Sequence, residues 1–258
     1  MGQPAYRAKQ VFGWLHARRA AGFDEMTNLP AALRGQLAQA WYIDHLPVAQ
    51  QQESADGTMK YLLGLADGNC VETVLMRYHH GNSLCISSQV GCRMGCRFCA
   101  STQGGLVRGL TAGEMAGQVY TAIEQSCQPV SHIVLMGIGE PLDNFDNVMD
   151  FISIITHPEG LDISIRNISL STCGLVPVLH KLAQRRLGLT LSVSLHAADE
   201  KTRGGMMPVN QKWPVEELVA ACKAYQAATG RRVSFEYAMV RGVNDRPEDA
   251  KRLAGLLR

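Results

Sequence analysis

A repeating alternation of strand-like and helix-like segments over residues 84–258 constrains the fold of this chain more than any other feature. Short apolar runs typical of buried strands alternate five times with longer segments of helical periodicity. Strand–helix units in succession favour a parallel sheet that curls towards a barrel, and an open doubly wound sheet is the less favoured alternative. The predicted strands are 84–88, 132–136, 168–171, 189–194 and 233–240.

The helices between these strands have recognisable ends. Thr111 and Glu114 have the spacing of a capping box, in which each residue satisfies a free amide of the other. Pro214 suits a helix start and Gly230 a helix end. The predicted helices run from 111 to just before 129, then over 144–156, 176–186, 214–230 and 248–258.

The first part of the chain has a different pattern. Residues 6–42 predict two helices, and 59–65 with 70–77 predict two strands joined by a turn. We therefore predict an α/β protein with three parts: a helical accessory module over 1–45, a β-hairpin extension over 46–82, and a partial barrel over 83–258.

Enzymes with a parallel barrel carry their chemistry at the carboxyl ends of the strands. Each of the first four predicted strands is followed there by a polar, cysteine-rich or glycine-rich motif. These motifs lie at 91–99, 137–140, 171–174 and 194–196. Their arrival at one rim is stronger evidence for a single active site than any one motif alone.

Cys92, Cys96 and Cys99 have C-x3-C-x2-C spacing in the first of these motifs. Three thiolates so close together can hold three irons of a [4Fe-4S] cluster and leave the fourth iron open. An open iron can bind S-adenosylmethionine and deliver an electron to it, which is radical chemistry carried by the cofactor. The spacing therefore predicts a radical enzyme with a [4Fe-4S] cluster and S-adenosylmethionine as cofactors.

Zinc and disulfides are the alternatives for clustered cysteines. A structural zinc site usually takes four ligands, and no second cysteine pair follows this motif. The beginning of the sequence lacks the apolar core of a signal peptide, and no apolar run is long enough to span a membrane. We therefore expect reduced thiols in a cytoplasmic protein without membrane contact. The five remaining cysteines are scattered singly: Cys70, Cys85, Cys127, Cys173 and Cys222.

A formal net charge of +2 does not by itself indicate a nucleic-acid-binding protein. Residues 1–20 nevertheless carry four basic side chains and no acidic one, and arginine pairs occur at 185–186 and 231–232. Clusters of this size can contact phosphates, although solvated helix faces are the default interpretation on charge alone.

Several side chains in the motifs are candidates for ligand contacts. Glu140 could accept a hydrogen bond from an ammonium group, and Phe98 could pack on an adenine ring, although core filler is the alternative. Ser171, Ser194 and His196 could contact carboxylate and ribose groups, although a histidine of this kind is more often structural.

Taken together, the motifs resemble the radical S-adenosylmethionine adenine methyltransferases that modify 23S rRNA at carbon 2 of adenine 2503 and also modify tRNA. The resemblance covers nearly the whole chain, in the segments 6–10, 23–29, 72–74, 87–92, 96–99, 136–142, 171–174, 194–197, 207–210, 236–237 and 242–245. It implies rRNA and tRNA as partners, an external electron donor such as a flavodoxin, and a monomer in the cytoplasm.

The resemblance also implies roles for individual residues. Cys92, Cys96 and Cys99 would ligate the cluster. Glu72 would be the proton acceptor, and Cys85 would resolve a covalent enzyme–RNA adduct by forming a disulfide with a methyl-carrying cysteine. The residues in contact with S-adenosylmethionine would be Gly139, Glu140, Ser171, Ser194, Leu195 and His196.

In the family, the methyl-carrying cysteine lies beyond the last helix predicted here, and none of the eight cysteines occupies that position. We therefore expect a chain truncated at its C-terminus, with five of about six strand–helix units. Such a chain could hold a cluster and S-adenosylmethionine but could not methylate RNA. Two alternatives to the function remain: methylation of carbon 8 of the same adenine, which confers antibiotic resistance, and a zinc-stabilised RNA-binding protein without catalysis. A radical enzyme that acts on a protein substrate is a weaker one.

Overall fold

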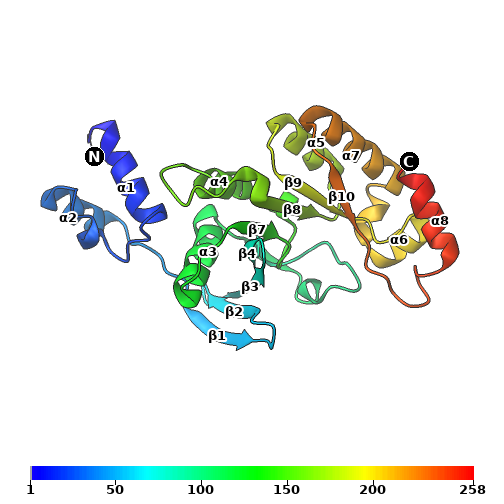
Figure 1. The fold of residues 1–258 in the computed structure, drawn as a ribbon, viewed down its shortest axis with the longest axis horizontal. Coiled ribbons are helices and arrows are strands. Elements are labelled where there is room, and N and C mark those ends of the chain that lie inside the picture. The colour runs from blue at the N-terminus through cyan, green and yellow to red at the C-terminus, as the bar shows by residue number, and fades with distance from the viewer. Residues whose placement is uncertain (1) are drawn as a thin grey trace.

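One long mixed sheet with helices on one face dominates the computed structural model, which describes residues 2–258 (Figure 1). The strand order is β1-β2-β3-β4-β7-β8-β9-β10. Strands β4, β7, β8, β9 and β10 are parallel neighbours in chain order, which confirms the predicted strand–helix repeat. Their bounds are Gly81–Cys85, His132–Leu135, Ile168–Thr172, Thr190–Ser194 and Val233–Glu236. The last of them, β10, lies at the edge of the sheet.

A helix follows each parallel strand, close to the predicted position. These helices are α3 (Ala112–Ser126), α4 (Phe145–Ile155), α5 (Val176–Arg185), α7 (Val215–Thr229) and α8 (Pro247–Leu256). The capping box is present: Thr111 Oγ1 accepts a hydrogen bond from Glu114 N, and Glu114 accepts one from Thr111 N. Gly230 ends α7 with a positive φ of 68°, a conformation that suits glycine.

The two faces of the sheet differ in chemistry because side chains alternate along each strand. One face is apolar and buried under the helices, with side chains such as Leu84, Ile133, Leu170, Leu191 and Val193. The strand register places a polar, less buried set on the other face, which we call the inner face. Its members include Glu72, Cys85, Ser171, Ser194 and Glu236. The inner face is the interior of the partial barrel.

The antiparallel half of the sheet contains elements that the sequence did not predict. The hairpin of β2 (Met59–Gly64) and β3 (Cys70–Tyr78) is confirmed. However, β3 also pairs with β4, and β1 (Val48–Glu53) pairs with β2, so the hairpin is continuous with the barrel sheet. Strand β1 escaped prediction because it is a mostly exposed edge strand without apolar alternation.

Three smaller elements near the rim were also missed. Strands β5 (Gln89–Gly91) and β6 (Leu106–Gly109) form a two-stranded ribbon on either side of the cysteine loop. Helix α6 (Glu200–Met206) lies between β9 and α7. Each is too short to show a periodic sequence pattern.

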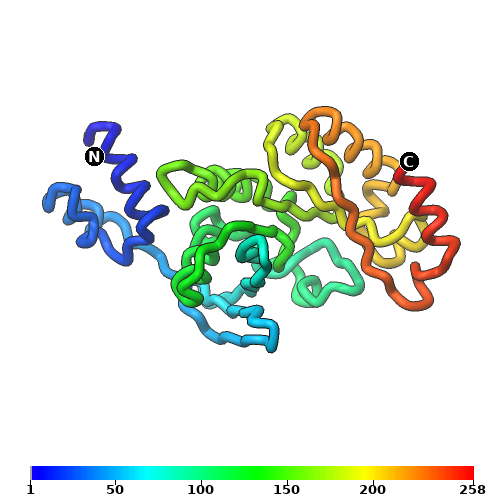
Figure 2. Tube along the Cα trace, in the orientation of Figure 1, coloured from blue at the N-terminus to red at the C-terminus, as the bar shows by residue number. Residues whose placement is uncertain are grey.

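The N-terminal helices α1 (Ala5–His16) and α2 (Ala31–Ala40) pack around a small core of their own, which consists of Ala20, Met26, Leu29 and Leu33. They lie at the end of the molecule opposite the C-terminal helices (Figure 2). His16 Nδ1 and the Tyr120 hydroxyl lie 2.7 Å apart, which joins α1 to α3. The domain boundaries at 45 and 82 stay predictions. Across residues 2–258, no helix is both long and apolar enough to span a membrane.

Candidate active site

A cavity of about 300 Å³ lies at the carboxyl ends of the parallel strands, where the sequence motifs were expected to meet. All three cysteines of the C-x3-C-x2-C motif line it. Its wall also contains most of the other predicted site residues: Phe98, Gly139, Glu140, Ser171, Ser194 and His196. Loops far apart in the sequence therefore form one site.

The ribbon of β5 and β6 holds the cysteine loop in place. Cys92 N donates a hydrogen bond to Gly105 O over 2.9 Å, and Gly91 adopts a positive φ of 72° beside the same carbonyl. A side chain on Gly91 would overlap Gly105 O, so this close approach requires glycine. The loop geometry thus depends on two glycines that bear no reactive group.

The three thiols form a donor set that suits a cluster with one thiolate per iron. Burial raises the pKa of Cys92, and burial together with the neighbouring thiols raises the pKa of Cys96 to about 11. The thiols of Cys92 and Cys96 are therefore protonated until metal binding displaces their protons. Within residues 2–258, no three Cys, His, Asp or Glu side chains are already gathered around a single-ion position.

Glu140 is buried in the cavity wall and is held by main-chain amides. Its Oε2 accepts a hydrogen bond from Cys173 N over 2.7 Å, and its Oε1 accepts one from Leu142 N over 3.0 Å. Burial raises the pKa of Glu140, although these hydrogen bonds oppose the shift. Each carboxylate oxygen keeps a further lone pair that could accept from a cationic ligand.

Gln89 and Asp143 fix the position of Glu140, and the sequence analysis did not single out either residue. Gln89 Oε1 accepts a hydrogen bond from Glu140 N, and Gln89 Nε2 donates to Asp143, each over 2.9 Å. Asp143 also pairs with Arg93 in the cysteine loop. The signal available in the sequence was the place of Gln89 in segment 87–92, which carries the family resemblance.

Glu236 is a site residue that sequence reasoning missed. It lies at the carboxyl end of β10 and lines the cavity. Ser194 Oγ donates to Glu236 Oε2 over 3.1 Å, and Ser171 Oγ lies 3.4 Å from both carboxylate oxygens. The available signal was its place in segment 236–237, which carries the family resemblance, but the strand predicted over 233–240 put Glu236 in mid-strand, whereas β10 ends there.

His196 is neutral and has a defined tautomer. Its Nδ1 accepts a hydrogen bond from Ala238 N over 3.0 Å, so the ring proton lies on Nε2. Burial, and secondarily the charge of Arg203, lowers the pKa of His196 to about 4. Its ring packs edge-on against Phe98, with centroids 4.9 Å apart. Leu195 is fully buried and does not line the cavity.

Glu72 and Cys85 lie outside the cavity wall, although they belong to the same inner face. Glu72 forms an ion pair with Lys60 on the neighbouring strand β2. Ser87 Oγ donates to Glu72 O over 2.7 Å and accepts from Ile138 N over 3.0 Å, which links β3 to the loop that contains Glu140. Burial raises the pKa of the Cys85 thiol.

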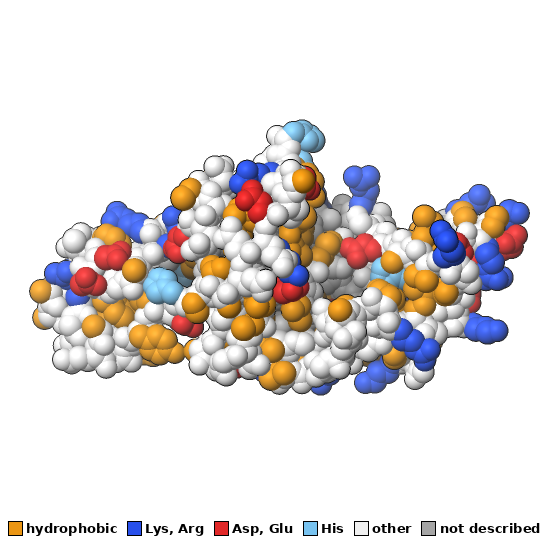
Figure 3. All heavy atoms as spheres, turned by 90° about the horizontal axis from the view of Figure 1, so that it is seen from below, with side chains coloured by type: hydrophobic (Ala, Val, Ile, Leu, Met, Phe, Trp, Pro, Cys, Tyr) orange, Lys and Arg blue, Asp and Glu red, His pale blue; other side chains and the backbone are white. Residues whose placement is uncertain are grey.

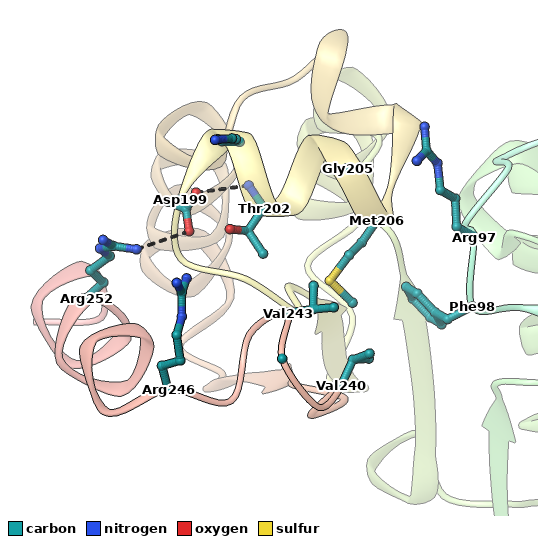
Figure 4. A pocket seen from close by; sticks show the side chains of 12 residues that line it. Arg97, Phe98, Asp199, Thr202, Gly205, Met206, Val240, Val243, Arg246 and Arg252 are labelled. Atoms are coloured by element: carbon teal, nitrogen blue, oxygen red, sulfur yellow. Dashed lines mark hydrogen bonds and ion pairs between the residues drawn. The ribbon is translucent and has the colours of Figure 1, made fainter.

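A second, larger pocket of about 830 Å³ adjoins the cavity at Phe98, which lines both (Figure 4). Apolar side chains of α6 and of the loop after β10 contribute to its wall, including Met206, Val240 and Val243. Asp199 is its one acidic lining residue, against the cations Arg97, Lys201, Arg246 and Arg252. Basic side chains gather at this C-terminal end of the molecule (Figure 3).

Comparisons with known proteins agree with this architecture. The model of the radical SAM superfamily matches residues 86–254, and that of the ribosomal RNA large subunit methyltransferase N-terminal domain matches 1–43. Proteins named probable dual-specificity RNA methyltransferase RlmN are similar to this chain in Lachnospira eligens and Desulforudis audaxviator, with 51% and 53% identity. These matches cover 100% and 95% of this chain, and 74% and 77% of the relatives.

This chain belongs to the RlmN family of radical SAM methyltransferases. A solved radical SAM methyltransferase from Sphaerobacter thermophilus also superposes on it with a TM-score of 0.93 and 42% identity, covering 100% of this chain and 76% of that one. The chain spans about three quarters of the length of the RlmN relatives.

RlmN membership confirms the predicted enzyme class, the partial barrel and the cofactors, which are a [4Fe-4S] cluster and S-adenosylmethionine. It also contradicts the alternative of a zinc-stabilised RNA-binding protein without catalysis. The predicted disulfide is not supported, because all eight cysteines are free in the structure.

Proposed function

We propose that this RlmN-family chain serves the methylation of carbon 2 of adenine, at position 2503 of 23S rRNA and in tRNA. The observation that carries this proposal is the convergence of Cys92, Cys96, Cys99 and Glu140 on one cavity at the barrel rim. We further propose that the protein is a cytoplasmic monomer and that a flavodoxin-like protein supplies its electrons.

Cys92, Cys96 and Cys99 would hold the cluster, one thiolate to each of three irons. When bound, the cluster supplies the electron that cleaves S-adenosylmethionine. The protein itself would hold the cluster within the cavity. The cysteine loop, the Arg93–Asp143 pair and Gln89 connect the cluster site directly to Glu140.

S-adenosylmethionine would lie across the cavity from Glu140 towards Phe98. The free lone pairs of Glu140 would accept from the amino group of its methionine part, and the backbone of Gly139, which lines the cavity, would contact the same ligand. Ser171 and Ser194, oriented by Glu236, would contact its hydroxyl and carboxylate groups. The Leu195 and His196 segment would complete the contact, with the His196 Nε2 proton available as a donor.

The target adenine would enter from the inner face, where Glu72 and Cys85 lie. Glu72 would accept the proton that leaves carbon 2, on a carboxylate kept in place by Lys60. Cys85 would take part in the release of RNA from the enzyme. These roles rest on the family resemblance and on the shared sheet face.

RNA contacts would extend over both ends of the molecule. At the N-terminal end, Trp41 and Tyr42 are 65% and 79% exposed, which suits stacking on unpaired bases. At the C-terminal end, the cations Arg97 and Lys201 of the second pocket could contact phosphates. A base that leaves its stack to reach the cavity costs a few kcal/mol, which favours adenines in loops.

Anaerobic reconstitution with iron and sulfide tests the proposal. We expect about four irons per chain and an electron paramagnetic resonance signal that shifts on addition of S-adenosylmethionine. Cys96→Ala should abolish the signal, whereas Cys127→Ala, which changes an exposed cysteine that does not line the cavity, should retain it. One zinc per chain, or a cluster indifferent to S-adenosylmethionine, would refute the proposed site.

Nucleoside digestion of RNA treated with the full-length enzyme then identifies the product. Carbon 2 methylation supports the proposal, and carbon 8 methylation would assign the chain to the sister activity. The expectation that these 258 residues alone do not methylate RNA stays a prediction, and methyladenosine formed by them would contradict it.

A further inference from the structure

Arg203 of α6 is the largest fully buried side chain of the protein, directly behind the wall of the cavity. Its neighbours at the wall are Cys173 and Ser194, both of which line the cavity. Burying a guanidinium is costly unless a carboxylate balances its charge. Yet no carboxylate forms an ion pair with Arg203 anywhere in residues 2–258.

Four N–H groups of Arg203 donate to neutral acceptors. Nη2 donates to Cys173 O over 2.8 Å and to Ser194 O over 3.2 Å. Nε donates to Leu195 O over 3.1 Å, and Nη1 donates to Asn210 Oδ1 over 3.0 Å. The guanidinium therefore joins the ends of β8 and β9, from which the proposed S-adenosylmethionine contacts project.

The nearest balancing charge on the far side of Arg203 is indirect. Asn210 Nδ2 donates to Glu200 Oε2 over 2.6 Å, so a carboxylate reaches the guanidinium only through an amide. Towards the cavity, the contact with Cys173 O brings the guanidinium to a wall residue of the same cavity that Cys96 lines. Helix α6 is also joined to the cysteine loop, because Arg97 N donates to Met206 O over 2.9 Å.

We propose that Arg203 is a positioning residue with two tasks, an inference that rests on the proposed function. Its hydrogen bonds hold the segments after β8 and β9 in the conformation that binds S-adenosylmethionine. Its positive charge offsets the negative charge of the thiolate-bound cluster, which grows by one electron on reduction. A buried cation behind the cavity wall makes reduction easier and raises the cluster's reduction potential.

Two substitutions separate these tasks. Arg203→Lys keeps the positive charge but cannot donate all four hydrogen bonds, whereas Arg203→Gln keeps donor groups but is neutral. Arg232→Gln is the matched control, because Arg232 is an exposed arginine beside the opposite end of β10. Each protein is reconstituted anaerobically and titrated with dithionite while the reduced-cluster resonance is recorded, and S-adenosylmethionine binding to the oxidised protein is measured by calorimetry.

We expect both Arg203 variants to bind S-adenosylmethionine at least about tenfold more weakly, because hydrogen bonds from a charged donor are lost. Only Arg203→Gln should shift the reduction potential to a more negative value, and Arg232→Gln should match the unsubstituted protein in both measurements. If Arg203 only stabilised the fold, the two Arg203 variants would not differ in reduction potential while sharing the loss of affinity for S-adenosylmethionine.

Arg203→Lys and Arg203→Gln with unchanged affinity and potential would overturn the inference. If Arg203→Gln does not fold, Arg203→Lys still tests the positioning role, because an unchanged affinity of that variant for S-adenosylmethionine refutes it. An unsubstituted protein that assembles no cluster would instead refute the proposed function itself, and this inference with it.

Discussion

Gly139→Ala should be among the most damaging single-methyl additions to this protein. Gly139 has a φ of 107°, outside the left-handed region that other residues adopt with modest strain. A Cβ at this position would lie 2.6 Å from Gln89 Cβ and 2.8 Å from Gln89 N. Gln89 in turn holds Glu140 N, so the added methyl would displace the residue proposed to bind the methionine amino group.

The expected cost combines two effects. An unfavourable backbone conformation costs about 1–3 kcal/mol. Overpacking against a buried neighbour costs about another 1–3 kcal/mol. For a chain of 258 residues, a total of about 4 kcal/mol lowers the midpoint of thermal unfolding by roughly 8–16 °C. Binding of S-adenosylmethionine by the reconstituted protein should weaken together with the stability.

Two nearby glycines separate the two effects. Gly104 has no positive φ, and a Cβ there would meet nothing within 4 Å, so Gly104→Ala should leave the midpoint nearly unchanged. Gly105 has a φ of 68° with equally open space, so Gly105→Ala should show the backbone cost alone, about 1–2 kcal/mol. Thermal unfolding followed by circular dichroism gives all three values. A Gly139→Ala shift no larger than that of Gly105→Ala would refute the steric argument.

Three further predictions concern charge and exposed aromatic groups. Because the pKa of His196 is lowered to about 4, the free energy of unfolding should fall by about 2 kcal/mol between pH 7.5 and pH 5. Denaturant titrations of His196→Asn should show a weaker dependence on pH. Lys60→Met breaks a half-exposed ion pair with Glu72 and should lower the free energy of unfolding by less than about 1 kcal/mol. A midpoint of thermal unfolding lowered by more than about 5 °C would contradict this. Trp41→Ala should weaken RNA binding about tenfold in a filter-binding assay, whereas Tyr78→Ala, at an exposed tyrosine of β3, should not.

The elements with a repeating pattern were predictable from sequence. The parallel strands β7 to β10 and the helices between them came out within a few residues, because a buried strand and an amphipathic helix each impose a period on their side chains. The elements that were missed, β1, β5, β6 and α6, are either exposed or too short to carry a period.

The order of strand–helix units could be predicted from the residues alone, and with it the rim on which the cysteine motif, Glu140 and His196 lie. The reason is that the carboxyl ends of parallel strands share one edge of the sheet. The groups that hold those residues in position became visible only in the folded chain. Glu236, Gln89 and Arg203 act through hydrogen bonds between segments distant in the chain, and such contacts leave no periodic or local pattern in the sequence.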